Sequence, residues 1–197
     1  MPDSPQLVRA KATLRTPLLA ARAARTAQSR AAAADALADA LATALAEHLP
    51  ADGVVAATAP LAEEPGHGRL PAALPGRVLL PVVPARGRQL GWAWWSGVLT
   101  TGRFGLLEPP GEPLPPATLA AADVVLVPAL AVAADGTRLG RGGGWYDRAL
   151  PHARPDAVLV AVVFDEEVVG HLPAGEHDRR VSAVVTPSGG WRRLGSA

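Results

Sequence analysis

The chain has 197 residues, of which 19 are Lys or Arg and 18 are Asp or Glu, so its formal net charge is +1. This balance supplies no global field that would attract nucleic acid. The absence of cysteine from the sequence excludes disulfides, thiolate catalysis and cysteine-ligated metals. The hydrophobic fraction of 49% is sufficient for the core of one ordinary domain.

Neither end of the sequence nor its interior shows a membrane or export signal. No apolar run is long enough to predict a transmembrane helix. The N-terminus is polar and leads into a charged segment, so it lacks the basic, apolar and small-residue order of a signal peptide. We therefore expect a cytoplasmic protein with no membrane contact.

The N-terminal region, residues 6–48, predicts mostly helix, because alanine is abundant and leucines form a partly amphipathic stripe. Pro17 predicts a kink or a new helix start. Residues 26–30 predict a second break, with Ser29 as a candidate cap.

Basic residues on these helices have two interpretations each. Lys11 is the only lysine in the chain. Its compact charge suits a phosphate oxygen, and the alternative is a chance surface residue. Arg22, Arg25 and Arg30 are interpreted as a solvated face rather than a nucleic-acid patch, and the alternative is that one of them assists phosphate binding.

The remainder of the chain alternates short apolar runs with loops and brief helices. We expect strands at 54–58, 77–83, 90–95, 123–128, 157–164 and 181–185, helical segments at 68–74, 117–122, 144–150 and 165–172, and a proline-rich loop at 108–116. Continuous apolar strands separated by helices are typical of a largely parallel sheet covered on both faces. The predicted fold class is therefore α/β.

One glycine-rich stretch, "RLGRGGGWYDRAL" from Arg138 to Leu150, can be tested against known nucleotide loops. Gly140 and Gly142 fit the first two positions of a dinucleotide fingerprint, but Trp145 lies where its third glycine is required. No Lys followed by Ser or Thr comes after the last glycine, as a Walker A loop requires. The spacing excludes both modules.

The same stretch still predicts an anion cradle. Glycines allow the backbone to approach a ligand and expose successive N–H groups, and a helix starting near Gly144 would direct its positive end there. Arg138 and Arg141 add charged donors. Asp147 is either a favourable charge in the first turn of that helix or a ligand for Mg²⁺. The alternative is a surface loop, but the stretch follows a predicted buried strand, where α/β sheets bind ligands.

Other catalytic constellations are missing from the sequence. The five histidines show no H-E-x-x-H spacing, so we expect no zinc site. The serines show no G-x-S-x-G elbow. Trp92, Trp94 and Trp95 are interpreted as core residues, with stacking on a ligand as the alternative.

The glycine-rich stretch resembles the G-x-G-x-G-Y-Y-D signature of the 5-formyltetrahydrofolate cyclo-ligase family (5,10-methenyltetrahydrofolate synthetases). Further resemblances follow in family order along nearly the whole chain: "KATLR" at 11–15, "EEPGHGRL" at 63–70, "GRFGLLEP" at 102–109 and "EHDRRVSAVVT" at 176–186. The resemblance implies a single domain, with residues 1–50 as helices packing on the sheet and residues 187–197 as a C-terminal tail. It also implies a three-layer α/β/α sandwich of the NagB/RpiA/CoA-transferase type.

The resemblance implies ATP- and Mg²⁺-dependent ring closure by a monomer. ATP would phosphorylate the formyl oxygen of 5-formyltetrahydrofolate, and N10 would then displace phosphate to form 5,10-methenyltetrahydrofolate. The alternative is a relative that binds nucleotide or RNA without closing the folate ring.

The family's site residues carry over by position. The resemblance implies ATP contacts at Lys11, Ala12, Thr13, Leu14, Arg15, Arg138, Leu139, Gly140, Arg141, Gly142, Gly143, Gly144, Trp145 and Tyr146. It implies folate contacts at Ala59, Glu64, Arg141, Gly142, Gly143, Gly144 and Trp145, with Glu63 as the alternative to Glu64. It implies Mg²⁺ ligands at Asp147 and Asp178, and catalytic roles for Lys11, Arg141 and Tyr146. Trp145 departs from the signature, because it keeps an aromatic face but lacks the hydroxyl of Tyr.

Overall fold

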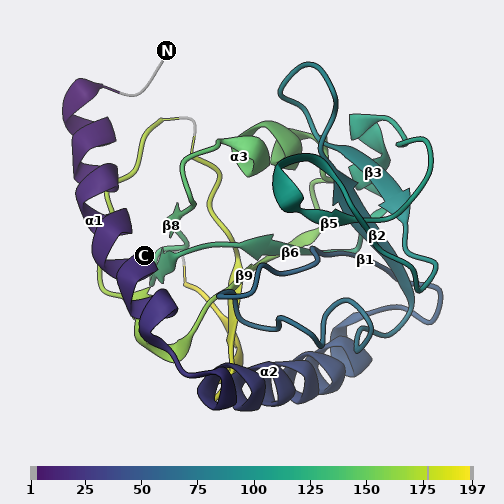
Figure 1. Cartoon of the computed structure of the whole chain (residues 1–197), viewed down its shortest axis with the longest axis horizontal. Coiled ribbons are helices and arrows are strands. Elements are labelled where there is room, and N and C mark those ends of the chain that lie inside the picture. The colour runs from purple at the N-terminus through teal and green to yellow at the C-terminus, as the bar shows by residue number, and fades with distance from the viewer. Residues whose placement is uncertain (1–3, 177, 196–197) are drawn as a thin grey trace.

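The computed structural model describes residues 4–176 and 178–195 (Figure 1). Its helices are α1 (Pro5–Ala24), α2 (Ala27–His48) and α3 (Trp145–Ala149), with 3₁₀ turns η1 (Arg103–Gly105), η2 (Pro116–Ala121), η3 (Leu150–His152) and η4 (Asp165–Glu167). Its strands are β1 (Val54–Ala56), β2 (Arg77–Val82), β3 (Gly91–Trp94), β4 (Thr100–Thr101), β5 (Leu107–Glu108), β6 (Val124–Pro128), β7 (Ala131–Ala133), β8 (Arg138–Leu139), β9 (Val158–Val162), β10 (Val168–Val169), β11 (Ala183–Thr186) and β12 (Gly190–Arg193).

A seven-stranded sheet with the order β12-β11-β9-β6-β1-β2-β3 forms the centre of the molecule. The five strands β11, β9, β6, β1 and β2 are parallel, and the edge strands β12 and β3 run antiparallel to their neighbours. Strands β1 and β6 are adjacent, and the chain leaves them in opposite directions across the sheet. This arrangement is a topological switch point, the place where open α/β sheets bind ligands. The predicted α/β class with a mostly parallel sheet is confirmed.

Side chains along the central strands alternate between two cores. Val125 and Val127 of β6 pack into one cluster, whereas Val124 and Leu126 pack into the other. The period of two follows from strand geometry, in which successive side chains point to opposite faces. Because both faces are buried, the strand reads as an uninterrupted apolar run.

Different kinds of helix cover the two faces of the sheet. Helix α2 covers one face and buries Leu37, Leu41 and Leu45, which are spaced by about one helical turn (Figure 1). Shorter elements cover the other face, to which η2 contributes Leu119 and η3 contributes Leu150. The second face is therefore closed by short segments rather than by another long helix.

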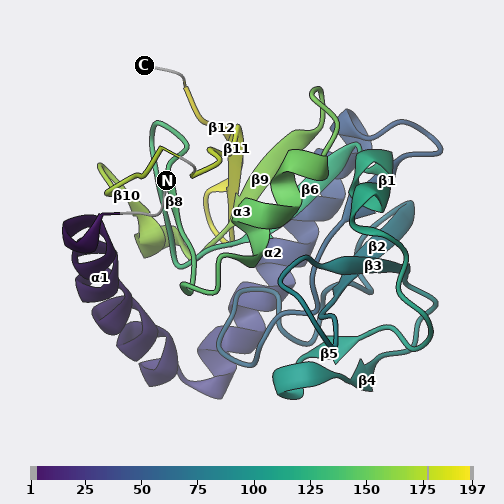
Figure 2. The same cartoon turned by 90° about the horizontal axis from the view of Figure 1, so that it is seen from above.

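Helix α1 lies beside a small second sheet, β10-β7-β8 (Figure 2). Its Leu14 and Leu18 pack against that sheet's buried residues. The helix continues through Pro17, so the predicted alternative of a new helix start at this residue is wrong. Proline has no N–H to donate to the carbonyl four residues earlier in the helix. Because Pro17 is exposed, water can hydrogen-bond to that carbonyl instead. The predicted break near residues 26–30 falls between α1 and α2, but Thr26 rather than Ser29 is the cap.

The interpretation of Arg22 as part of a solvated face is wrong. Its side chain is 1% exposed and donates to both carboxylate oxygens of Glu167, at 2.7 Å each. It also donates to the carbonyl of Ala129. A charge can be buried at this position because a bidentate carboxylate and a carbonyl occupy its donors.

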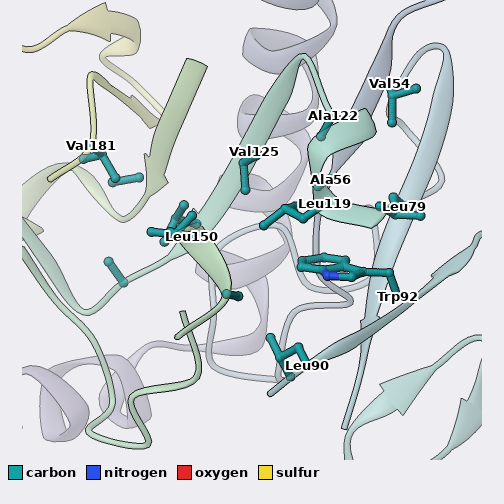
Figure 3. Close-up of a cluster of buried hydrophobic side chains, with 14 of the residues drawn as sticks. Val54, Ala56, Leu79, Leu90, Trp92, Leu119, Ala122, Val125, Leu150 and Val181 are labelled. Carbon is teal, nitrogen blue, oxygen red and sulfur yellow. The ribbon is translucent and has the colours of Figure 1, made fainter. Parts of the chain in front are cut away.

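Trp92 is a core residue, as expected. It is 1% exposed and lies among Leu79, Leu90 and Leu119 (Figure 3). Trp94 lies under the guanidinium of Arg77 and packs against the same core.

Several short elements differ from the expectation. Residues 68–74 form turns rather than a helix, and the helical segment expected at 165–172 stops after η4. The hairpin β4–β5, the small sheet and strand β12 were not predicted. Strands of two to four residues are too short to produce a readable periodicity. Among the described residues, no helix is both long and apolar enough to cross a membrane.

Candidate active site

A cavity of about 340 Å³ opens at the switch point of the sheet. Thr58 and Ala59, which follow β1, and Pro128 and Ala129, at the end of β6, line it together. The carboxyl ends of these parallel strands meet at one edge, so residues that are distant in sequence share one wall.

The glycine-rich loop forms a second wall of the cavity. Its residues 138–147 all line the cavity. Gly142 and Gly144 adopt φ values of +98° and +64°, which strongly favour glycine. Gly144 caps α3, so the predicted helix start at this position is confirmed. A side chain at Gly142 would also meet the guanidinium of Arg15 at 3.2 Å. Glycine at this position therefore allows Arg15 to pack directly on the loop.

Helix α1 supplies two cations to the same cavity. Lys11 and Arg15 lie four residues apart, so they share one face of the helix. Lys11 Nζ lies 2.7 Å from Asp178 Oδ2, and Arg15 Nε donates to the carbonyl of Gly140 at 2.8 Å. Lys11 is only 7% exposed, which contradicts the alternative of a chance surface residue. Both cations therefore line the same cavity as the glycine-rich loop, and Arg15 contacts the loop directly.

Arg141 joins the loop to two adjacent carboxylates. Its Nε donates to Glu64 at 2.9 Å, and its Nη2 donates to Glu63 at 2.8 Å. Glu64 lines the cavity, and its side chain is 12% exposed against 36% for Glu63. The hydrogen bond from Arg141 holds the pKa of Glu63 below its ordinary value. The geometry therefore favours Glu64 as the carboxylate that a ligand in the cavity would meet.

Two aspartates line the cavity beside these cations. Asp147 Oδ1 accepts from Arg138 at 2.5 Å, and Asp178 Oδ2 accepts from the backbone N–H of Gly175 at 2.6 Å. The described part of the chain contains no cluster of three or more His, Asp or Glu residues that could hold a metal. Mg²⁺ commonly uses only one or two carboxylates together with substrate phosphates. Asp147 and Asp178 fit such a site when a phosphate-bearing ligand supplies the remaining oxygens.

Two polar atoms in the cavity wall lack a hydrogen-bond partner among the described residues. They are the buried hydroxyl of Tyr146 and the buried Nε of Arg138. Burial raises the pKa of Tyr146, with Glu64 adding to the rise and Arg138 opposing it. The phenol is therefore a neutral donor at physiological pH. Unpaired buried polar groups are costly, so their place in a cavity wall indicates a ligand that completes them.

The opposite part of the cavity, which we call the apolar compartment, has a mostly apolar lining. The sequence did not predict it. Its lining comes from the end of β2, the following loop and the β4–β5 hairpin: Pro81, Val83, Leu90, Leu106, Leu107 and Glu108. Glu108 accepts from the backbone N–H of Val83 at 3.2 Å, which ties the hairpin to β2. The "GRFGLLEP" resemblance marked this segment, but no periodicity indicated that its leucines line a cavity.

Most of the sequence-predicted site residues meet at this cavity. Those that line it are Lys11, Arg15, Ala59, Glu64, residues 138–147 and Asp178. Ala12, Thr13 and Leu14 are not among its lining residues; Ala12 and Thr13 are exposed, and Leu14 packs toward the small sheet. Trp92, Trp94 and Trp95 do not line it either, whereas Trp145 does.

The fold and the site define an α/β protein in which one cavity at the switch point joins a cationic, glycine-rich wall to an apolar compartment. The family model of the 5-formyltetrahydrofolate cyclo-ligase family matches residues 8–187. The chain therefore belongs to the 5-formyltetrahydrofolate cyclo-ligase family.

Named relatives and solved structures agree with this assignment. A 5-formyltetrahydrofolate cyclo-ligase of Mycolicibacterium smegmatis is 46% identical over 144 residues, which cover 69% of this chain and 74% of that protein. The protein of the same name from Escherichia coli K12 is 38% identical over 47% of this chain and 52% of its own length. The structure of Aquifex aeolicus 5,10-methenyltetrahydrofolate synthetase matches with a TM-score of 0.70 at 27% identity, covering 93% of this chain and 92% of that one. A Mycoplasma pneumoniae synthetase structure, at 18% identity, covers 90% of this chain and 99% of its own, and its TM-score of 0.69 supports the fold.

Proposed function

We propose that the protein is an enzyme that converts 5-formyltetrahydrofolate into 5,10-methenyltetrahydrofolate, with ATP cleaved to ADP and phosphate and Mg²⁺ required. The observation that carries the proposal is a single cavity that joins a cationic, glycine-rich wall to an apolar compartment. A triphosphate and a folate require these two kinds of surface, and family membership supports the pairing.

The cationic wall would bind the triphosphate of ATP. Lys11 and Arg15 approach from α1, and the glycine-rich loop lines the same space. Phosphoryl transfer depends mainly on positioning and on neutralising charge, which these groups supply. Asp147 and Asp178 would hold Mg²⁺, which when bound screens the phosphate oxygens. Ala12, Thr13 and Leu14 would contribute only through the position of α1.

The folate would occupy the remainder of the cavity. Glu64 would accept hydrogen bonds from the amide and amine donors of the pterin, with Ala59 and Trp145 beside it. Tyr146 and Arg141 would bind the formyl oxygen as it receives the γ-phosphoryl group of ATP. N10 then attacks the formyl carbon and loses its proton, and the carbon–oxygen bond to phosphate breaks. Phosphorylation is required because an amide oxygen is otherwise a poor leaving group.

The finer classification of the protein follows from the same family. We propose a three-layer α/β/α sandwich of the NagB/RpiA/CoA-transferase type, acting as a cytoplasmic monomer. Helix α2 covers one face of the sheet, and η2, α3 and η3 cover the other. This arrangement of helices on both sides of a sheet supports the three-layer architecture.

The proposal is tested by following formation of the methenyl product at its near-ultraviolet absorbance. We expect the absorbance to rise when 5-formyltetrahydrofolate, ATP and Mg²⁺ are all present, and to stay flat when either ATP or Mg²⁺ is omitted. Folded protein that binds ATP without any rise in absorbance would support the alternative of a nucleotide-binding relative and overturn the proposal.

A further inference from the structure

A small chamber adjoins the main cavity on the side of the glutamate loop. Its volume is about 20 Å³, and it shares four lining residues with the main cavity, namely Thr58, Glu64, Pro128 and Ala129. Buried apolar side chains, including Val162 of β9, form much of its remaining wall. We call this space the side chamber. A group held in it lies beside Glu64, the carboxylate that would contact the folate.

Arg22 of α1 also lines the side chamber. The side chain is 1% exposed, and its Nε and Nη2 atoms donate to Glu167 and to the carbonyl of Ala129. Its Nη1 atom has no hydrogen-bond partner among the described residues. A buried charged donor without a partner is costly. The position of Arg22 therefore indicates that a group in the side chamber accepts a hydrogen bond from Nη1.

The size and the polarity of the side chamber fit one water molecule. A buried water requires roughly 10–15 Å³ of such space and two to four polar partners. Arg22 supplies a donor, Glu64 supplies an acceptor, and the hydroxyl of Thr58 can act as either. An apolar atom in the same space would leave Arg22 without its acceptor. The chamber therefore has the properties of a hydration site rather than of a packing defect.

The charge of Arg22 acts on the glutamate pair at the cavity. The hydrogen bond from Arg141 is the main cause that lowers the pKa of Glu63, burial opposes it, and the positive charge of Arg22 adds to the lowering. Arg22 therefore lies within electrostatic reach of Glu63 and of its neighbour Glu64, although it lies on a different element.

We propose that one water molecule in the side chamber links Arg22 to Glu64, and that Arg22 is thereby a positioning residue for folate binding. This inference rests on the proposed function. The water accepts from Nη1 of Arg22 and donates to the carboxylate of Glu64. Arg141 and the backbone N–H of Leu61 each use one site on that carboxylate, so both of its oxygens can accept a further bond. A bridging water is nearly as favourable as a direct hydrogen bond, and it fixes the direction in which Glu64 faces the pterin.

The first pair of variants removes the link while keeping α1 in place. In R22K, the three donors of the ammonium group are needed for the two oxygens of Glu167 and the carbonyl of Ala129, so none remains for the water. The matched control is R25K, which makes the same change three residues later on α1. Arg25 pairs with Glu166 at the surface and does not line the side chamber.

The second pair of variants fills the chamber and leaves Arg22 unchanged. V162I adds one carbon atom to a side chain that lines the side chamber but not the main cavity. V160I adds the same atom two residues earlier, on the same strand and the same face of the sheet, where neither space is lined. Both changes crowd the core, so the control separates loss of the water from loss of stability.

The kinetic test measures KM for 5-formyltetrahydrofolate and KM for ATP in all four variants. We expect R22K and V162I to raise KM for the folate about 3- to 10-fold and to leave KM for ATP within about twofold. R25K and V160I should change neither. In an E64Q background, R22K should raise KM for the folate no further, because the link then has no carboxylate to position.

Three results would overturn the inference. An equal rise in both KM values would show that Arg22 only anchors α1, since Lys11 and Arg15 lie on that helix. A full effect of R22K in the E64Q background would show that it does not act through Glu64. A high-resolution crystal structure should show one ordered water between Arg22 and Glu64, and an empty side chamber would also overturn the inference. The crystal structure tests the water even if the wild-type protein does not convert the folate, in which case the proposed function fails by itself.

Discussion

Two adjacent carboxylates, Glu63 and Glu64, share the guanidinium of Arg141 but face different surroundings. Only Glu64 lines the cavity, where its second oxygen accepts from the backbone N–H of Leu61 at 3.0 Å. Glu63 is three times as exposed, at 36% against 12% for the side chains. Both residues hold Arg141, but in the proposed reaction only Glu64 would also contact the folate.

Replacing each of these glutamates by glutamine tests that separation. We expect Glu64→Gln to raise KM for 5-formyltetrahydrofolate roughly tenfold, because an amide replaces one acceptor oxygen with a donor facing the ring's own donors. Glu63→Gln should change KM less than about threefold. Steady-state kinetics of both variants measure the difference, and Glu63→Gln controls for the loosening of Arg141. Equal effects would reject Glu64 as a folate contact.

Lys11 and Asp147 lie on different walls of the cavity and serve the same phosphates in the proposed reaction. We expect Lys11→Ala and Asp147→Ala each to lower turnover at least tenfold, or roughly 1.4 kcal/mol of lost transition-state stabilisation. Thermal unfolding of each variant checks that the loss does not arise from misfolding. Wild-type turnover in both variants would refute the roles assigned to these residues.

Among the elements, α1 carries cavity-lining charges but buries little apolar surface. Its only buried residues are Lys11 and Arg22. Arg15 and Lys11 connect one part of the helix to the cavity, and Arg22 connects its C-terminal part to Glu167 and Ala129. Ala129 also lines the cavity. The buried pair of Arg22 and Glu167 thus secures the element that presents Lys11 and Arg15.

The neighbouring residues Glu166 and Glu167 provide a matched pair of substitutions. Glu167→Gln leaves the charge of Arg22 buried without its counterion, so we expect it to lower the free energy of unfolding by about 3–5 kcal/mol. Glu166 pairs with Arg25 at the surface. Glu166→Gln should therefore lower the free energy of unfolding by less than about 1 kcal/mol. Urea unfolding of both variants gives the two values. Similar losses would contradict the importance of burial for this contact.

The turn between β11 and β12 depends on a carboxylate from another element. Asp165 of η4 accepts hydrogen bonds from Thr186, Ser188 and Gly189. Burial by itself would raise the pKa of Asp165, but these donors outweigh it and hold the pKa below its usual 3.8. Because the folded protein favours the ionised form, Asp165 contributes to stability above pH 3.8. This contribution is lost as the pH falls through the pKa that Asp165 has in the folded state, which lies below 3.8.

Asp165→Asn should therefore lower the free energy of unfolding by about 1–2 kcal/mol at neutral pH. The difference from the wild-type protein should shrink at values below pH 3.8, where the wild-type carboxyl becomes protonated. Urea unfolding across this range measures it. A difference that stays constant down to the lowest pH would show that the ionised form of Asp165 is not favoured by folding.

At the scale of the whole molecule, the parallel sheet explains why sequence reasoning succeeded for the central elements. Strands such as β6 and β9 are buried on both faces and read as continuous apolar runs, and α2 places leucines at helical spacing. The glycine-rich loop was recognisable because its backbone conformation at Gly142 and Gly144 strongly favours residues without side chains.

Elements of only a few residues, and contacts between distant segments, were beyond sequence reasoning. The hairpin β4–β5 and the sheet β10-β7-β8 depend on pairing between strands. Most of these strands are two residues long, which is too short for a hydrophobic periodicity to be recognised in the sequence. The burial of Arg22 could not be predicted from the sequence either, because its partner Glu167 lies 145 positions away along the chain. The apolar compartment was missed because Leu106 and Leu107 face the cavity only through the placement of the hairpin.

The sequence by itself determined the α/β class, the central strands, the glycine-rich loop and the resemblance to one enzyme family. Each strand and the glycine-rich loop depend on the residue types within one short segment, and the class and the resemblance depend only on the order of such segments along the chain. Only the tertiary structure decided that Glu64 rather than Glu63 lines the cavity, that Arg22 is buried, and that Arg148 of α3 contacts the loop that carries Arg88. These properties depend on which distant segments the sheet brings together, and that choice is made by the packing of the whole chain.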